Sequence, residues 1–223
     1  QSPNDAPFKP EYIKIHHYDF EIRDGQSILV KKLPDEEEEI KPVAVYCGVD
    51  PASSLSMKAD FFVIATIGID NKGNHYIIHL VRTKVDPAEQ PDMIIKIFKK
   101  YKPKRMKIET VAYQEALRSA VRKQMQEQEL YIPGLEKGVK PRTRKSERLL
   151  SLVPLLAKGQ FYFRPVDIEA QAEFLSYPRG KHDDVMDAIW TALDGSRPSR
   201  RKEFKVIEDD STLGKKFIDW MTL

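Results

Sequence analysis

The hydrophobic pattern from Val43 onward predicts a run of strands at the start of a folded core. Residues 43–50 form a nearly continuous apolar stretch, which is typical of a central strand buried on both faces. Two more apolar stretches, 61–70 and 75–83, flank the polar sequence NKGN at 71–74, which predicts a hairpin turn. We therefore expect a meander of three strands.

After the meander, the pattern alternates between helical and extended segments. In residues 87–101 the side chains Met93, Ile94, Ile97 and Phe98 recur at helical spacing and form one apolar stripe. By the same criteria we expect strands at 105–110, 130–134 and 160–165, and helices at 112–129, 144–159 (kinked at Pro154), 167–176 and 183–193. A meander that leads into strand–helix–strand units implies an α/β fold, a mixed sheet with helices on its faces.

The first 42 residues precede this core and differ from it in character. Short strands are expected in 11–22 and 27–33, on either side of an Asp24-Gly25 turn. The acidic run DEEEE at 35–39 predicts a solvated linker, because adjacent carboxylates on a flexible segment are not held in place. The expected division is then a preface at 1–42, a core domain at 43–197 and a tail at 198–223.

Composition narrows the class of protein without deciding it. The chain has 223 residues and a net charge of +3, which is too small to indicate a nucleic-acid partner by itself. No apolar run is long enough to span a membrane. Cys47 is the only cysteine, so no internal disulfide is possible, and its apolar surroundings predict a buried structural role.

Carboxylates follow several predicted elements at informative places. Asp50 ends the first core strand and Glu109 ends the strand at 105–110, where ligand groups collect in sheets with parallel neighbours. Asp183, Asp184 and Asp187 lie at the start of the last helix, where capping and the helix dipole also favour acids. Carboxylates from three separate elements suit Mg²⁺ or Mn²⁺, and two such ions could promote a phosphodiester displacement.

Several motifs together carry a family resemblance. GVDPA, FFVIATIGID, IET, the basic stretch KPRTRKSERLLSLVPLLAKGQFYF and KHDDVMDAIWTAL occur in this order. They resemble the nuclease domain of the large terminase subunit of tailed bacteriophages, an RNase H-like (RuvC-like) nuclease joined behind a DNA-translocating ATPase. The resemblance covers residues 43–196 and implies an RNase H-like mixed sheet, an antiparallel three-strand meander plus parallel strands, with helices on both faces.

The resemblance also implies roles for the carboxylates. Asp50 would bridge two Mg²⁺ or Mn²⁺ ions, Glu109 would complete one ion site, and an aspartate of HDDVMD would complete the other. Asp183 is the first choice for this third catalytic acid, and Asp184 and Asp187 are further candidate metal ligands. The neighbouring His182 is a candidate polar helper.

Basic residues before the acids are expected to contact DNA. The segment 137–148 carries six basic residues, and Gly134, Gly138 and Pro141 favour an extended conformation. Phosphate contacts of this kind give affinity and salt dependence without sequence preference, whereas the alternative is a solvated charge run. The expected DNA-contacting residues are Lys137, Lys140, Arg142, Arg144, Lys145, Arg148, Arg179 and Lys181.

Taken together, these features predict a metal-dependent endonuclease that cuts double-stranded DNA with little sequence specificity. The G-x-x-x-x-G-K-[ST] phosphate loop is absent, so the ATPase domain is expected elsewhere in a longer parent protein that acts in the cytoplasm of the infected bacterial host. The portal and the small terminase subunit are further possible partners. A tail that docks the portal ring and a disordered tail are both open. The alternative functions are a Holliday-junction resolvase or transposase-type nuclease and a catalytically silent nucleic-acid-binding module.

Overall fold

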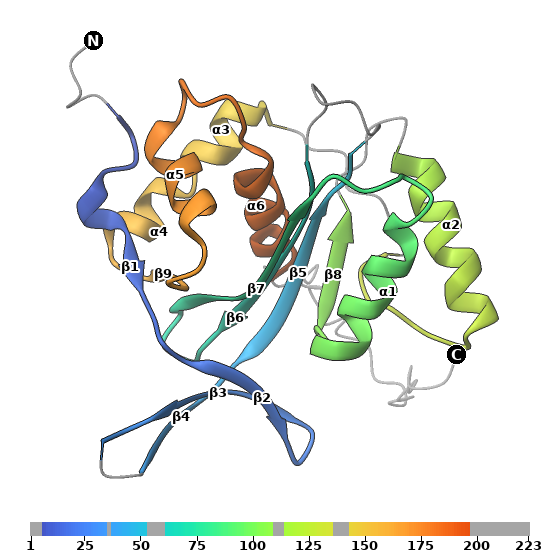
Figure 1. Cartoon of the computed structure of the whole chain (residues 1–223), viewed down its shortest axis with the longest axis horizontal. Coiled ribbons are helices and arrows are strands. Elements are labelled where there is room, and N and C mark those ends of the chain that lie inside the picture. Colours follow the sequence, from blue (N-terminus) through green and yellow to red (C-terminus); the bar gives the residue numbers. More distant parts are fainter. Residues whose placement is uncertain (1–5, 35–36, 53–60, 109–113, 136–142, 197–223) are drawn as a thin grey trace, which may run out of the picture.

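The computed structural model describes residues 6–34, 37–52, 61–108, 114–135 and 143–196. These residues form a six-stranded mixed sheet and a separate three-stranded antiparallel sheet. Figure 1 shows helices on both sides of the larger sheet, α1 and α2 on one side and α3 to α6 on the other. The expected α/β fold with helices on both faces is confirmed.

The larger sheet has the strand order β1-β9-β7-β6-β5-β8. The meander at its centre is antiparallel, while β8 runs parallel to β5 and β9 runs parallel to β7 and β1. Its strands are β1 (Lys14–Ile15), β5 (Ala44–Asp50), β6 (Phe62–Ile69), β7 (His75–Thr83), β8 (Arg105–Ile108) and β9 (Phe161–Phe163).

The smaller sheet has the order β2-β3-β4 and lies next to the beginning of β5. Its strands are β2 (Asp19–Arg23), β3 (Gln26–Lys32) and β4 (Glu38–Pro42). The predicted hairpin around Asp24-Gly25 is therefore confirmed, with both turn residues at positive φ. The prediction of a solvated acidic linker is wrong for its second half, because Glu38 and Glu39 pair with β3 and form ion pairs with Arg23 and Lys41.

The helices follow the predicted apolar stripes closely. They are the short 3₁₀ helix η2 (Pro10–Tyr12) and the α-helices α1 (Gln90–Tyr101), α2 (Gln114–Glu127), α3 (Lys145–Leu150), α4 (Val153–Ala157), α5 (Ile168–Ser176) and α6 (Asp184–Ser196). The single kinked helix predicted at 144–159 is instead two helices, α3 and α4. Pro154 lacks an N–H and its ring clashes with the carbonyl four residues earlier, at Leu150, where α3 ends.

A third prediction that the structure corrects is the strand at 130–134. These residues form no strand and end in a turn at Gly134, which has a positive φ. Their link to the sheet is a backbone hydrogen bond from the Met106 N–H to the Pro133 carbonyl. Proline provides no donor of its own, so the segment does not extend the ladder beside β8.

The sheet separates two hydrophobic cores because its side chains alternate between faces. In β5, Val45, Cys47 and Val49 pack with α1 and α2. In β6, Val63 and Ala65 pack on the opposite face with the apolar side chains of α6. Burial raises the pKa of the Cys47 thiol to about 12, so this cysteine is an inert core residue, as expected.

The helix α6 lies unusually close to β5, and Gly48 permits this approach. A Cβ at position 48 would overlap the Ala188 carbonyl oxygen and the Ala192 backbone nitrogen. The α6 side chains on this face, including Ala188, Ile189 and Ala192, are fully buried. A strand residue without a side chain therefore sets the distance between the central strand and the last helix.

We expect the substitution Gly48→Ala to destabilise the fold by on the order of 3 kcal/mol, because the new methyl group meets backbone atoms that cannot rotate away. Gly73→Ala is the comparison, since its Cβ would meet no atom within 4 Å and only the positive φ of 80° opposes it, at a cost of about 1 kcal/mol. Urea unfolding measures both. Equal losses would contradict the close-packing explanation.

Candidate active site

Asp50 stands at the end of β5 and faces the α6 side of the sheet. Val45, Cys47 and Val49 point into the opposite core, so the alternation of the strand places the Asp50 side chain on the same face as Gly48. The parallel neighbour β8 ends at the same end of the sheet, because its last residue, Ile108, pairs with Val49. Glu109 follows Ile108 directly and lies outside the described residues.

Asp184 lies at this same end of the sheet, in the first turn of α6. The helix backbone crosses Gly48 at Ala188, and Asp184 lies one turn earlier, in the direction in which β5 continues to Asp50. The Asp184 Oδ2 atom accepts a hydrogen bond of 3.3 Å from the backbone N–H of Phe61. Phe61 directly precedes β6, whose first residues pair with the end of β5. Asp50 and Asp184 therefore lie at one end of the sheet.

Asp183 and Asp187 both contact the ammonium group of Lys145. The Lys145 Nζ atom lies 2.7 Å from Asp183 Oδ1 and 2.5 Å from Asp187 Oδ2. Burial opposes protonation of Lys145, but the hydrogen bonds to the two aspartates outweigh it and raise the pKa of the ammonium group. Arg148 adds a longer ion pair of 3.6 Å to Asp187. The three aspartates of the motif thus divide between two environments.

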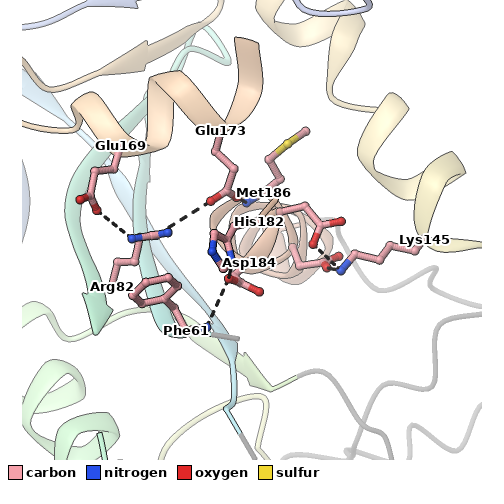
Figure 2. Close-up of polar contacts among 10 residues, drawn as sticks. Phe61, Arg82, Lys145, Glu169, Glu173, His182, Asp184 and Met186 are labelled. Carbon is pink, nitrogen blue, oxygen red and sulfur yellow. Dashed lines mark hydrogen bonds and ion pairs between the residues drawn. The ribbon is translucent and has the colours of Figure 1, made fainter. Parts of the chain in front are cut away.

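Figure 2 shows a second group of polar side chains around Asp184. His182 lies 3.5 Å from Asp184, measured from Nδ1 to Oδ2, and its ring packs edge-on against Phe61. The Arg82 guanidinium lies over the Phe61 ring, with its Cζ atom 3.5 Å from the ring centroid. The candidate helper His182 is therefore placed beside Asp184.

Glu173 and Arg82 belong to this group, and the sequence reasoning did not find them. Burial raises the pKa of the Glu173 carboxyl to about 7. A hydrogen bond from the Met186 N–H acts in the opposite direction and lowers this pKa, whereas the nearby charge of Asp184 raises it further. A signal was present in the helix 167–176, because Glu173 lies between Ala170 and Phe174 on the apolar stripe. A carboxylate at such a position needs buried partners.

The predicted DNA-contacting residues fall into three sets. Lys137, Lys140 and Arg142 lie outside the described residues. Arg144, Arg179 and Lys181 are exposed near the start of α3 and α6. Lys145 and Arg148 form ion pairs with aspartates at the start of α6. Arg148 is only 6% exposed, and its guanidinium lies 4.8 Å from the Trp190 ring centroid. Their role in DNA contact stays a prediction.

The donors at this edge suit a hard divalent cation. Carboxylate oxygens are the ligands that Mg²⁺ and Mn²⁺ prefer, and a cation would offset the repulsion between Asp50 and Asp184. Within the described ranges, no group of three His, Cys, Asp or Glu side chains is arranged to hold a metal ion. Glu109, the third acid that the sequence predicts as a ligand, lies outside those ranges.

Comparison with known proteins identifies the family. Residues 47–194 match the sequence model of the terminase RNaseH-like domain, which is well over half of the chain. The chain belongs to this family. The match spans the domain from β5 to α6, including Asp50 and the three aspartates at the start of α6. No functionally curated protein matches the terminase domain significantly.

Solved structures show the same fold for this terminase domain. The large terminase nuclease of the thermophilic phage G20c with bound magnesium is 17% identical, with a TM-score of 0.53, covering 86% of this chain and 96% of that one. The nuclease domain of Thermus phage P74-26 is 16% identical, with a TM-score of 0.53 and coverages of 86% and 94%. The P22 large terminase nuclease domain is 15% identical, with a TM-score of 0.56 and coverages of 83% and 88%.

Among the helices in the described part of the terminase domain, none has both the length and the apolar character that crossing a membrane requires.

We expect Lys145→Met to destabilise the domain by about 1–2 kcal/mol, between the values for exposed and buried ion pairs, because the lysine is half exposed whereas Asp187 is buried. In an Asp187→Asn background the same change should cost less than half as much. A double-mutant cycle from urea unfolding measures this coupling. Additive effects would show that the pair contributes nothing.

Proposed function

We propose that this chain is the nuclease part of a viral genome-packaging terminase, a metal-dependent endonuclease that cuts double-stranded DNA with little sequence specificity. The observation that carries the proposal is the meeting of Asp50 and Asp184 at one end of the sheet, in a chain of the terminase RNaseH-like family. Solved structures of this fold include terminase nucleases, one of them with bound magnesium.

The third catalytic carboxylate in this proposal is Asp184, in place of the first choice Asp183. The Asp183 carboxylate is already paired with the Lys145 ammonium, on the side of α6 that faces α3. The Asp184 carboxylate is directed toward Phe61, at the edge where β5 ends. Asp184 is also 3% exposed, so its orientation is fixed by packing. Asp183 and Asp187 then serve to bind Lys145.

Asp50, Glu109 and Asp184 would hold two metal ions, either Mg²⁺ or Mn²⁺. Such ions lower the pKa of a bound water and neutralise charge on the leaving oxygen of a phosphodiester. The chain itself supplies the fixed positions of the carboxylates. The backbone N–H of Phe61 orients Asp184, and the register of β5 against β6 orients Asp50.

The exposed cations near α3 and α6 are proposed to bind the DNA backbone. Arg144 is exposed directly before α3, and Arg179 and Lys181 are exposed directly before the acidic motif at the start of α6. Contacts to phosphate give affinity that does not depend on the base sequence, which agrees with cutting of low specificity. Lys137, Lys140 and Arg142 are included in this proposal on the basis of the sequence alone.

The setting of the reaction is part of the proposal as well. We place the chain in a parent protein with an ATPase domain, in the cytoplasm of the infected bacterial host, with the portal and the small terminase subunit as further partners. The family assignment supports this setting. The expectation that residues 1–42 connect to the ATPase domain belongs to the same proposal.

The assignment of the acids predicts a ranking of single variants. Asp50→Ala and Asp184→Asn should each reduce Mn²⁺-dependent plasmid cleavage by at least about 100-fold, because each removes a ligand, whereas Asp183→Asn should stay within about tenfold of the wild type. Initial rates of supercoiled plasmid loss measure the ranking, and circular dichroism confirms folding. A reversed order of Asp183 and Asp184 would return the metal-ligand role to Asp183.

Two other outcomes correspond to the alternative functions. Wild-type cutting by the Asp50→Ala variant, or no cutting by the wild type with either metal, would favour a catalytically silent nucleic-acid-binding module. Preferential cleavage of a four-way junction over linear duplex at equal ion concentration would favour a resolvase.

The proposed phosphate contacts predict a change in salt dependence. Arg144→Glu should weaken binding to a duplex and reduce the slope of log K against log salt by about 1. Lys72→Glu is the matched charge reversal, since Lys72 is exposed in the β6–β7 turn, at the opposite end of the sheet from Asp50. Fluorescence anisotropy over a salt series distinguishes the two. Identical slopes in both variants would assign Arg144 to a solvated surface.

A further inference from the structure

We infer that Glu173 and Arg82 are positioning residues that together hold Asp184 in place for metal binding, a clamp formed by α5 and β7. This inference rests on the proposed function, because it takes Asp184 to be a metal ligand. Figure 2 shows the two side chains beside the start of α6, with Phe61 between Arg82 and Asp184.

The first half of the clamp holds the helix. Glu173 comes from α5, and its Oε1 atom accepts a hydrogen bond of 3.0 Å from the backbone N–H of Met186, in the first turn of α6. The N–H groups of a first turn have no acceptor within their own helix, so a carboxylate from outside satisfies one of them and interacts favourably with the helix dipole. Glu173 therefore fixes the end of α6 that carries Asp184.

The second half holds the carboxylate. Arg82 stacks on the Phe61 ring with 3.5 Å between Cζ and the ring centroid, and the backbone N–H of the same Phe61 donates to Asp184. The Arg82 Nε atom also lies 4.0 Å from Glu173 Oε2. One guanidinium thus links the residue that orients the Asp184 carboxylate to the residue that anchors its helix.

A direct contact of Arg82 with a DNA phosphate fits these observations less well. Its side chain is 16% exposed and makes a 2.9 Å ion pair with Glu169 in addition to the contact with Glu173. Two acidic side chains already contact the guanidinium, and a phosphate would have to displace one of them. The contacts instead match the outer partners of metal sites, which orient ligands and whose loss weakens metal affinity by about 10–100-fold.

The test measures Mn²⁺ binding to the full chain without DNA, by isothermal titration calorimetry well below the melting temperature. Arg82→Met and Glu173→Ala should each weaken Mn²⁺ binding by about 10–100-fold. Glu173→Gln keeps an oxygen that can accept from Met186 but loses the attraction to Arg82, so its affinity should lie between Glu173→Ala and the wild type. This conservative variant also keeps the test decisive if Glu173→Ala does not fold.

Arg118→Met is the matched control. Arg118 is 5% exposed, against 16% for Arg82, and pairs with Glu115 at 2.8 Å, but it lies on α2, on the opposite face of the sheet. We expect it to lower the melting temperature while leaving Mn²⁺ affinity unchanged. If the Arg82 and Glu173 variants behave like Arg118→Met, the two residues are structural only and the inference is wrong.

Asp184→Asn separates failure of the clamp from failure of the proposed function. When Asp184→Asn abolishes Mn²⁺ binding and the clamp variants bind normally, only the clamp is refuted. When Asp184→Asn itself binds Mn²⁺ as tightly as the wild type, the metal-ligand assignment fails and the clamp fails with it.

Discussion

The close contact between α6 and β5 at Gly48 is the constraint on which the site depends. Because no side chain separates the helix backbone from the strand, the first turn of α6 lies against the end of β5. Two carboxylates distant in the sequence, Asp50 and Asp184, are thereby brought to the same edge. The packing that stabilises the apolar core therefore also sets where these two acids lie.

The three aspartates of the acidic motif have different partners, among them the Lys145 ammonium group and the backbone N–H of Phe61. Lys145 compensates Asp183 and Asp187 on one side of α6, and this ion pair attaches α3 to the helix. Asp184 remains on the other side, beside the strand ends. A helix start that carries three acids is tolerated because Lys145 compensates two of them, because Asp184 faces away from that pair, and because the helix dipole favours negative charge there.

Much of the fold follows from local patterns, and the details of the site do not. Continuous apolar strands and the polar NKGN turn predicted the meander correctly, since one face or both faces of each strand are buried. The segment 130–134 misled because Leu130 and Ile132 pack against the core without forming a ladder. The break before Pro154 follows from the same sequence, because the proline ring clashes with the Leu150 carbonyl, where α3 ends.

The choice among the three aspartates illustrates the limit most clearly. Helical spacing shows that Asp183 and Asp187 share a face, but it does not show which face meets the strand. That depends on Lys145, which is 38 residues away from Asp183 in the sequence, and on the backbone N–H of Phe61, which has no side-chain signature. Long-range partners of this kind become visible only in three dimensions.

The first strand of the chain has a mechanical consequence. β1 and β8 are the two edges of the large sheet, and β1 is joined to β9 through only two residue pairs, with Phe8 packed against Phe174 nearby. Tension applied to the beginning of the chain would load this short pairing first. It would reach β5 through the sheet only across β9, β7 and β6. Along the chain, the load would pass through β2, β3 and β4 before it reached β5, so the strand that carries Asp50 would be loaded only after β1 and the smaller sheet.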